Sequence, residues 1–235
     1  GRAAVSKTAC RGFESFYPCQ TGRFLPSGFS FTPRGNFAAF TKKEGTSMPY
    51  FMTRYDSPVG LLSLVSDGQG LAGLWIEGQK YFAATLSRPP EMREDAPGLP
   101  EARAWLDRYF AGKKPEISEL PLAPMGSAFQ RGVWELLCEI PYGQVTTYGE
   151  IAKKMAARMG KSSMSGQAVG GAVGHNPISI IIPCHRVVGA NGSLTGYAGG
   201  IEKKVNCWST KAWICRNFLF PKRERHYNLQ QTSIE

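Results

Sequence analysis

Residues 176–188 read NPISIIIPCHRVV, and the rest of the chain is best understood from this stretch. Its Asn-Pro start ends any helix before it, because proline fixes the backbone and lacks the N–H donor. The apolar run at 180–182 predicts a short buried segment that holds the following side chains rigidly. A cysteine thiolate is a nucleophile, and a neighbouring histidine can accept its proton. An isolated Cys-His pair is more often inert core, so the interpretation of Cys184 as a nucleophile beside His185 depends on the longer motifs around it.

Two helices joined by a short turn precede this stretch. Thr147 is placed to cap a helix that runs to about Met159, and a turn of Gly, Ser and Lys follows at 160–163. A second helix is expected over 165–174. This is the helix-turn-helix pattern, whose second helix commonly enters a DNA groove. The segment 127–140 has a broad apolar face and predicts another helix that packs against the pair.

The region after Met48 has the pattern of a small α/β domain. Alternating apolar side chains predict three short strands, at 50–55, 60–66 and 71–76. An Asp-Gly turn separates the last two strands. Apolar side chains at helical spacing predict a helix over 101–111. A polar, proline-rich segment at 113–124 follows it and places a domain boundary near residue 121.

Longer motifs extend the central stretch in both directions. Residues 192–200 read GSLTGYAGG, and upstream stand FQxxVW at 129–134 and IPxGxVTTY at 140–148. Together with NPISIIIPCHRVV they strongly resemble the O6-alkylguanine-DNA alkyltransferases, also called methylated-DNA–protein-cysteine methyltransferases. The resemblance covers about Met48 to Gly200 and is strongest from Phe129 onward.

The resemblance implies an α/β domain followed by a mainly α domain. The first is a small RNase H-like domain over 48–121, and the second is a winged-helix-like DNA-binding domain over 122–204. The implied partner is double-stranded DNA that contains alkylated guanine. The implied reaction uses no cofactor and no metal: Cys184 takes the alkyl group from O6 and keeps it, once per protein molecule, in a chain expected to be a monomer. The base must leave the stack for this, because its alkyl group is inaccessible within the duplex.

Roles of individual residues follow from the same resemblance. Cys184 matches the alkyl acceptor, His185 a general base that acts through a water, and Asn176 a residue that orders the turn by hydrogen bonds. The residues that match the substrate pocket are Tyr148, Tyr197 and Val187. Those that match the DNA-binding surface are Gln167, Ala168, Gly170 and Arg186. Each tyrosine also has a plainer interpretation as a packing residue, and Asn176 as a helix stop.

The chain departs from the family at two places. Gln167 stands where the family usually has an arginine that fills the space left by the flipped base, and glutamine lacks its charge and planar reach. After Gly199-Gly200 the family continues with a helix whose glutamate completes a Cys–His–Glu relay, and that position falls on Lys211. We therefore hypothesise a frameshift near residue 205, so that 205–235 forms an irregular tail and the catalytic carboxylate is unassigned.

The overall charge says little about DNA binding. The formal net charge of +10 divides into +5 for residues 1–47, +1 for 48–200 and +4 for 201–235. Residues 1–47 show no helical or strand periodicity, which indicates a disordered tail or, if translation begins at Met48, a non-native leader. A basic end is a weak indication of a polyanion partner.

Cysteine and apolar patterns bound the cellular setting. The six cysteines form no CxxC pair, and no Cys/His cluster has zinc-ligand spacing. The sequence contains no apolar run long enough for a membrane span and no secretory signal pattern. Together with the DNA substrate that the resemblance implies, these patterns lead us to expect a cytoplasmic or nuclear protein that is not secreted.

Three alternatives stay open on the sequence alone. The first is a non-catalytic binder of alkylated bases with the same fold, which Cys184 argues against. The second is a helix-turn-helix regulator, which has no need for the Pro-Cys-His-Arg run. The third is a product disabled by its altered C-terminus.

Overall fold

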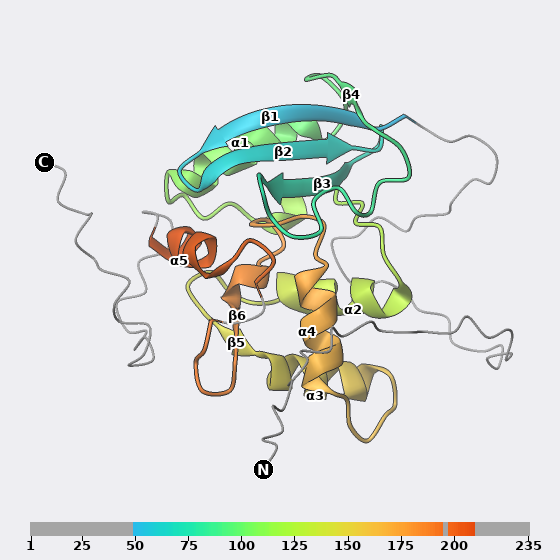
Figure 1. Ribbon diagram of the computed structural model, residues 1–235, viewed down its shortest axis with the longest axis vertical. Helices are drawn as coiled ribbons and strands as arrows, with labels where there is room; N and C mark the ends of the chain where they lie inside the picture. The colour runs from blue at the N-terminus through green and yellow to red at the C-terminus, as the bar shows by residue number, and fades with distance from the viewer. Residues whose placement is uncertain (1–48, 195–196, 210–235) are drawn as a thin grey trace, which may run out of the picture. The chain divides into compact units, whose positions relative to one another are not determined.

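The computed structural model describes residues 49–194 and 197–209, which belong to one compact unit of the chain. The described elements follow the order β-rich, then α-rich (Figure 1). The strands are β1 (Phe51–Ser57), β2 (Gly60–Ser66), β3 (Leu71–Ile76), β4 (Glu91–Met92), β5 (Thr146–Thr147) and β6 (Val187–Val188). The helices are α1 (Leu99–Phe110), α2 (Ala128–Cys138), α3 (Tyr148–Arg158), α4 (Gly166–Gly174) and α5 (Ile201–Ser209), with short 3₁₀ turns η1 (Ile117–Glu119) and η2 (Cys184–Arg186).

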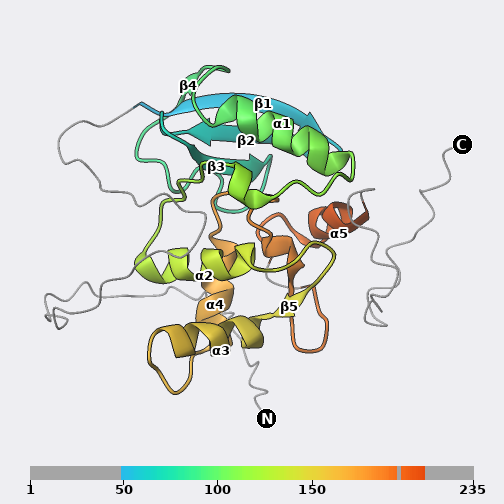
Figure 2. The same ribbon diagram turned by 180° about the vertical axis from the view of Figure 1, so that it is seen from behind.

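The first part is a four-stranded sheet with one helix on its face. The strand order is β3-β2-β1-β4, with antiparallel pairs except for β1 and β4, which run parallel. The helix α1 lies across one face, as both ribbon views show (Figure 2). It buries Ala102, Trp105, Leu106 and Tyr109, the spacing predicted from the sequence. Its start is capped by Glu101, whose carboxylate accepts a hydrogen bond from the Gly98 N–H at 2.9 Å.

Side-chain caps define the helices of the second part. Ser127 accepts a hydrogen bond from the Gln130 N–H at the start of α2. Thr147 does the same for α3, as the sequence predicts, and Ser165 does so for α4. Each cap satisfies a backbone donor that the first turn of a helix leaves unpaired. The strands β5 and β6 pair in parallel beside the helices.

The edge strand β3 joins the two parts. Leu74 N–H donates to the Pro177 carbonyl, and Ser179 N–H donates to the Leu74 carbonyl, each at 2.8 Å. The segment that precedes Cys184 thus adds to the sheet as a short parallel bridge at Ile178. The buried core is continuous from the sheet to α2, α3 and α4. Sequence patterns within each domain give no signal for this pairing, because it joins residues about a hundred positions apart.

Two details differ from the sequence-based expectations. The apolar run 180–182 is buried as predicted, but Ile180 has φ of +70°, which a β-branched residue rarely adopts. The segment is therefore a tight turn, a conformation that the apolar pattern does not predict. The expectation that regular structure is lost from residue 205 is wrong up to Ser209, because α5 continues to that residue. Lys211 and the rest of the tail lie outside the described residues, as do residues 1–48.

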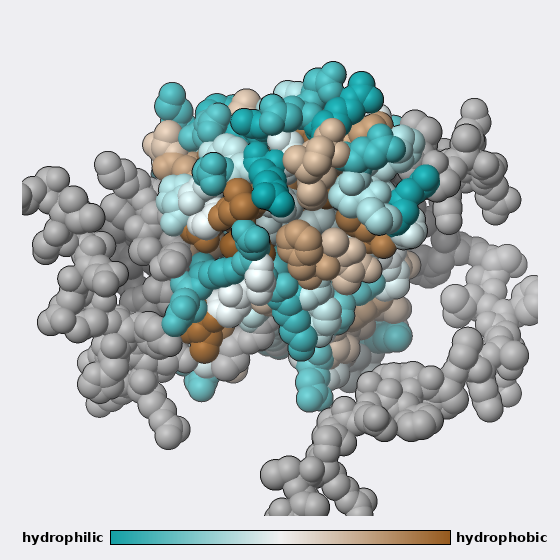
Figure 3. Space-filling view, turned by 45° about the horizontal axis from the view of Figure 1, so that its top comes forward, coloured by the Kyte–Doolittle hydropathy of each residue, from teal (hydrophilic) through white to brown (hydrophobic). Residues whose placement is uncertain are grey.

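On the face shown in Figure 3, hydrophilic side chains are interspersed with separate apolar areas. The large apolar side chains exposed in the described part are Tyr81, Phe82, Met92, Met159 and Ile201. No helix in the described ranges is long and apolar enough to cross a membrane.

Trp134 fixes α4 to α2 and gives the fold a direct test. Its indole N–H donates to the Ala172 carbonyl at 2.9 Å, and both groups are buried. Trp134→Phe leaves that carbonyl without this partner, so we expect the free energy of unfolding to fall by about 1–3 kcal/mol. Urea unfolding measures it, with Phe82→Leu on the surface as the control. Equal midpoints for Trp134→Phe and wild type contradict this account of α4.

Candidate active site

A single amide side chain organises the turn that carries Cys184. Asn176 Nδ2 donates to the Ile182 carbonyl at 2.9 Å and to the Ile178 carbonyl at 3.3 Å. Its Oδ1 accepts from the Ile178 N–H at 3.0 Å. The same Nδ2 donates to Cys184 Sγ at 3.0 Å. Asn176 thus satisfies backbone groups of an irregular buried turn and at the same time fixes the sulfur.

Cys184 lies at the start of η2 with only 4% of its surface exposed. Burial raises the pKa of its thiol above the ordinary value, because a charged thiolate is disfavoured away from water. The Asn176 hydrogen bond, the Lys204 ammonium and the N–H groups of Cys184 and His185 act in the opposite direction on that pKa. At neutral pH the group is therefore a thiol, with donors in place to stabilise the thiolate that forms during reaction.

His185 follows Cys184 and is completely buried. Its pKa is held well below the ordinary value, first by burial and then by the positive charges of Arg186 and Lys204. The imidazole is consequently neutral at physiological pH. A neutral imidazole is the form that can accept a proton, which suits the general-base role predicted for it.

Lys204 is a residue of the site to which the sequence assigned no role. It is fully buried, and its Nζ donates to the Val187 carbonyl at 2.6 Å and to the Leu194 carbonyl at 3.3 Å. These bonds hold α5 against β6 and place a positive charge where it lowers the pKa of Cys184. In the sequence, only the position of Lys204 four residues after Gly200 could have indicated that it belongs to the site.

The two predicted pocket tyrosines come from different elements. Tyr148 begins α3, and burial followed by the nearby Cys184 raises the pKa of its phenol to about 12. Tyr197 lies between Cys184 and α5, with its Oη 3.9 Å from Cys207 Sγ. Burial raises the pKa of Tyr197 well above its ordinary value, and the thiols of Cys207 and Cys184 act in the same direction. Both phenols therefore stay protonated, and each lies within the electrostatic influence of Cys184.

The predicted DNA-contact residues of α4 lie on its outer side. Gln167 and Ala168 are exposed, and Gly170 is partly buried. A β-carbon at Gly170 lies 3.8 Å from the Tyr148 ring, in ordinary contact, whereas one at Gly171 meets nothing within 4 Å. No charged side chain occurs in α4. Small residues therefore leave room for close approach to a partner, without attraction by charge from the helix itself.

Arg186 and Val187 are placed differently from the other predicted residues. Arg186 is 5% exposed; its guanidinium donates to the Ile140 carbonyl at 3.0 Å and stacks over Tyr142 at 5.2 Å. The prediction that Arg186 contacts DNA does not fit this position, because the guanidinium is held in the interior. Val187 in β6 is fully buried and pairs with Thr146 in β5. Its link to the site is its backbone carbonyl, which accepts a hydrogen bond from Lys204.

The other described thiols differ from Cys184. Burial raises the pKa of Cys138 and of Cys207 to about 12. For Cys138 the neighbouring carboxylates of Glu135 and Glu139 raise the pKa further. Cys184 is distinguished by the Asn176 amide, which donates to its sulfur, and by Lys204, which lowers its pKa. Among the residues that the structure describes, no group of three His, Cys, Asp or Glu side chains is arranged to hold a metal ion.

The raised pKa of Cys184 predicts how its reactivity depends on pH. The thiolate is the reactive form, and below the pKa its fraction grows about tenfold for each pH unit. We therefore expect the rate of Cys184 alkylation by iodoacetamide to rise steadily from neutral to alkaline pH. Peptide mass spectrometry after timed quenching measures this rate residue by residue. A plateau that begins below neutral pH contradicts the raised pKa.

Comparison with known proteins identifies relatives over most of the described residues. Residues 50–124 match the ribonuclease-like domain of the 6-O-methylguanine DNA methyltransferases, and residues 128–210 match their DNA-binding domain. The methylated-DNA–protein-cysteine methyltransferase of Haemophilus influenzae is 42% identical over 155 residues, which cover 66% of this chain and 82% of that protein. The corresponding protein of Methanosarcina acetivorans is 42% identical over 151 residues, which cover 64% of this chain and 90% of that protein.

A solved structure supports the same assignment. The crystal structure of Mycobacterium tuberculosis OGT in complex with DNA is 39% identical, with a TM-score of 0.58, and the match covers 69% of this chain and 92% of that one. In this chain the ribonuclease-like domain precedes the DNA-binding domain, and the Cys-His pair stands at the end of the active-site turn. The chain belongs to the O6-methylguanine DNA methyltransferase family.

Proposed function

We propose that this chain repairs DNA by direct transfer of the alkyl group of O6-alkylguanine to Cys184. The observation that carries the proposal is the buried Cys184 thiol, held by the Asn176 amide at 3.0 Å beside a neutral histidine. The Cys184 sulfur attacks the alkyl carbon, a carbon–sulfur bond forms, and the carbon–O6 bond breaks. The thiol proton passes to His185, directly or through a water, and the guanine is restored by taking up a proton.

The product explains why the reaction occurs once. A thioether is a stable linkage, and the described site presents no group that reverses it. The chain is therefore a stoichiometric reagent, and burial of the nucleophile is tolerable because it reacts with a single substrate. No cofactor takes part in these steps.

Access of the base to Cys184 requires that it leaves the duplex. We place α4 in a groove, with Gln167, Ala168 and Gly170 against the DNA and Gln167 occupying the space of the flipped base. Tyr148 and Tyr197 line the pocket for the extruded guanine. The partner is thus double-stranded DNA with an alkylated guanine, bound by a monomer. Such a protein acts in the cytoplasm or in a nucleus.

Transfer of a labelled methyl group tests the function. Incubation with duplex DNA that carries O6-[³H-methyl]guanine is expected to label the Cys184 peptide up to one methyl per chain. Cys184→Ala abolishes labelling, whereas Cys138→Ala, which removes another buried thiol, preserves it. Absence of label with tight binding to the lesion retained indicates a non-catalytic lesion binder instead. Absence of both refutes the proposal for this chain.

Gln167 gives a test of base flipping. Arginine at this position adds charge and planar reach, so Gln167→Arg is expected to raise the rate of transfer from duplex DNA about tenfold, which corresponds to about 1.4 kcal/mol. Gln167→Ala is expected to lower it. Single-stranded DNA needs no flipping, so it serves as the matched control, and the variants should there differ little. Equal effects on both kinds of DNA argue against the assigned role.

A further inference from the structure

Gln79, which lies just after β3, is the most deeply buried polar side chain of the segment 77–86. Only 6% of its surface is exposed. Its Oε1 accepts two hydrogen bonds, from the Ile76 N–H at 2.8 Å and from Ser179 Oγ at 3.1 Å. Gly78, with φ of +72°, lets the chain turn back so that the Gln79 N–H also donates to the Ile76 carbonyl at 3.0 Å. Gln79 is thus fixed to β3 and presents its amide oxygen to the active-site turn.

Ser179 is the residue of the active-site turn that forms the hydrogen bond with Gln79. Ser179 is 3% exposed, and its backbone N–H donates to the Leu74 carbonyl. The next residue is Ile180, whose φ of +70° is strained for a β-branched side chain. A strained conformation persists only when the surrounding structure holds it. The Gln79 bond and the β3 bridge supply that restraint on the outer side of the turn.

The turn between Ser179 and the nucleophile is short and internally bonded. The Ile181 N–H donates to the Ser179 carbonyl at 2.8 Å, and the Cys184 N–H donates to the Ile182 carbonyl at 2.8 Å. Asn176 holds the inner side and the sulfur. A displacement at Ser179 therefore passes through few bonds to Cys184, and in-line attack on the alkyl carbon is sensitive to such a displacement.

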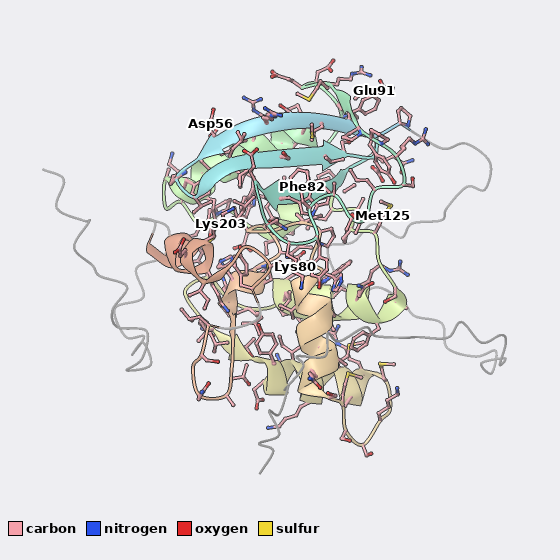
Figure 4. The ribbon with its side chains drawn as sticks, viewed as in Figure 1. Asp56, Lys80, Phe82, Glu91, Met125 and Lys203 are labelled. Carbon is pink, nitrogen blue, oxygen red and sulfur yellow. The ribbon has the colours of Figure 1, made fainter. Side chains whose placement is uncertain are left out.

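The segment 77–86 also contacts the part of the site that follows Cys184 in the chain. The Lys80 N–H donates to the Ala198 carbonyl at 2.9 Å, and the Lys203 ammonium on α5 donates to the Glu77 carbonyl. Lys80 and Lys203 both lie at the junction between the sheet and the helical part (Figure 4). The segment after β3 therefore contacts the turn that carries Cys184 and also the loop and helix that carry Tyr197 and Lys204.

We infer that Gln79 is a positioning residue for alkyl transfer: through Ser179 it transmits the geometry of the ribonuclease-like domain to Cys184. This inference rests on the proposed function. It assigns that domain a part in the chemistry, although the residues proposed to contact the base come from the other domain. Gln79 acts through another residue and does not touch the substrate.

Single-turnover kinetics with saturating lesion DNA test the inference. Gln79→Met keeps the shape and removes the acceptor, and we expect the rate constant of transfer to fall about 10- to 100-fold, with DNA affinity unchanged. Ser179→Ala should lower the rate constant of transfer by a similar factor. The double variant should be no slower than either single variant, because both substitutions remove the same hydrogen bond between Gln79 and Ser179. Gln79→Glu retains the acceptor oxygens and should recover most of the rate. Gln69→Met, an exposed position after β2, is the matched control.

Other results overturn the inference. Multiplied effects in the double variant show that Gln79 does not act through Ser179, and unchanged rates with a lower melting temperature show a purely structural role. If the wild-type chain itself transfers no methyl group, the proposed function fails separately. Iodoacetamide alkylation of Cys184 then supplies the readout: its pH profile should shift to higher pH in Gln79→Met and Ser179→Ala, and an unchanged profile contradicts the inference.

Discussion

The hydrogen bonds of the Asn176 side chain are the constraint on which the rest of the site depends. The turn before Cys184 is buried but belongs to no regular ladder, so its carbonyls need partners other than strands. One amide serves Ile178 and Ile182 and also reaches the sulfur. Each buried carbonyl left unmatched costs about 1–3 kcal/mol, so this side chain can hold even a turn that contains a strained Ile180.

Burial and reactivity make opposite demands on Cys184. Removal from water favours the neutral thiol, whereas attack on the alkyl carbon needs negative charge on sulfur. The site meets both demands with fixed donors: the Asn176 amide, the backbone N–H groups and the Lys204 ammonium all lower the pKa that burial raises. These groups are already oriented, so they stabilise the developing thiolate without rearrangement. The same Lys204, however, makes protonation of His185 less favourable.

The position of Lys204 shows how α5 takes part in the site. A buried ammonium is costly unless its hydrogen bonds are satisfied, and here the carbonyls of Val187 and Leu194 accept them. The electrostatic environment of Cys184 therefore depends on the packing of a helix that comes late in the chain. On the other side, β3 and Gln79 bear on the same turn. Cys184 is thus held between β3 and Gln79, which come early in the described chain, and α5, which comes last.

The sequence by itself determined the elements and the chemistry. Local patterns predicted β2 and β3, the Thr147 cap and the helix pair, because capping and periodicity act between near neighbours. The motif around Cys184 predicted the nucleophile and its family. Only the tertiary structure decided that Arg186 is interior, that Lys204 lowers the Cys184 pKa, and that β3 and Gln79 support the turn. The Arg186 and Lys204 contacts lie within the helical domain, and the β3 and Gln79 contacts join the two domains. All of them pair residues that are separated in the sequence, so these hydrogen bonds and this burial exist only in the folded chain.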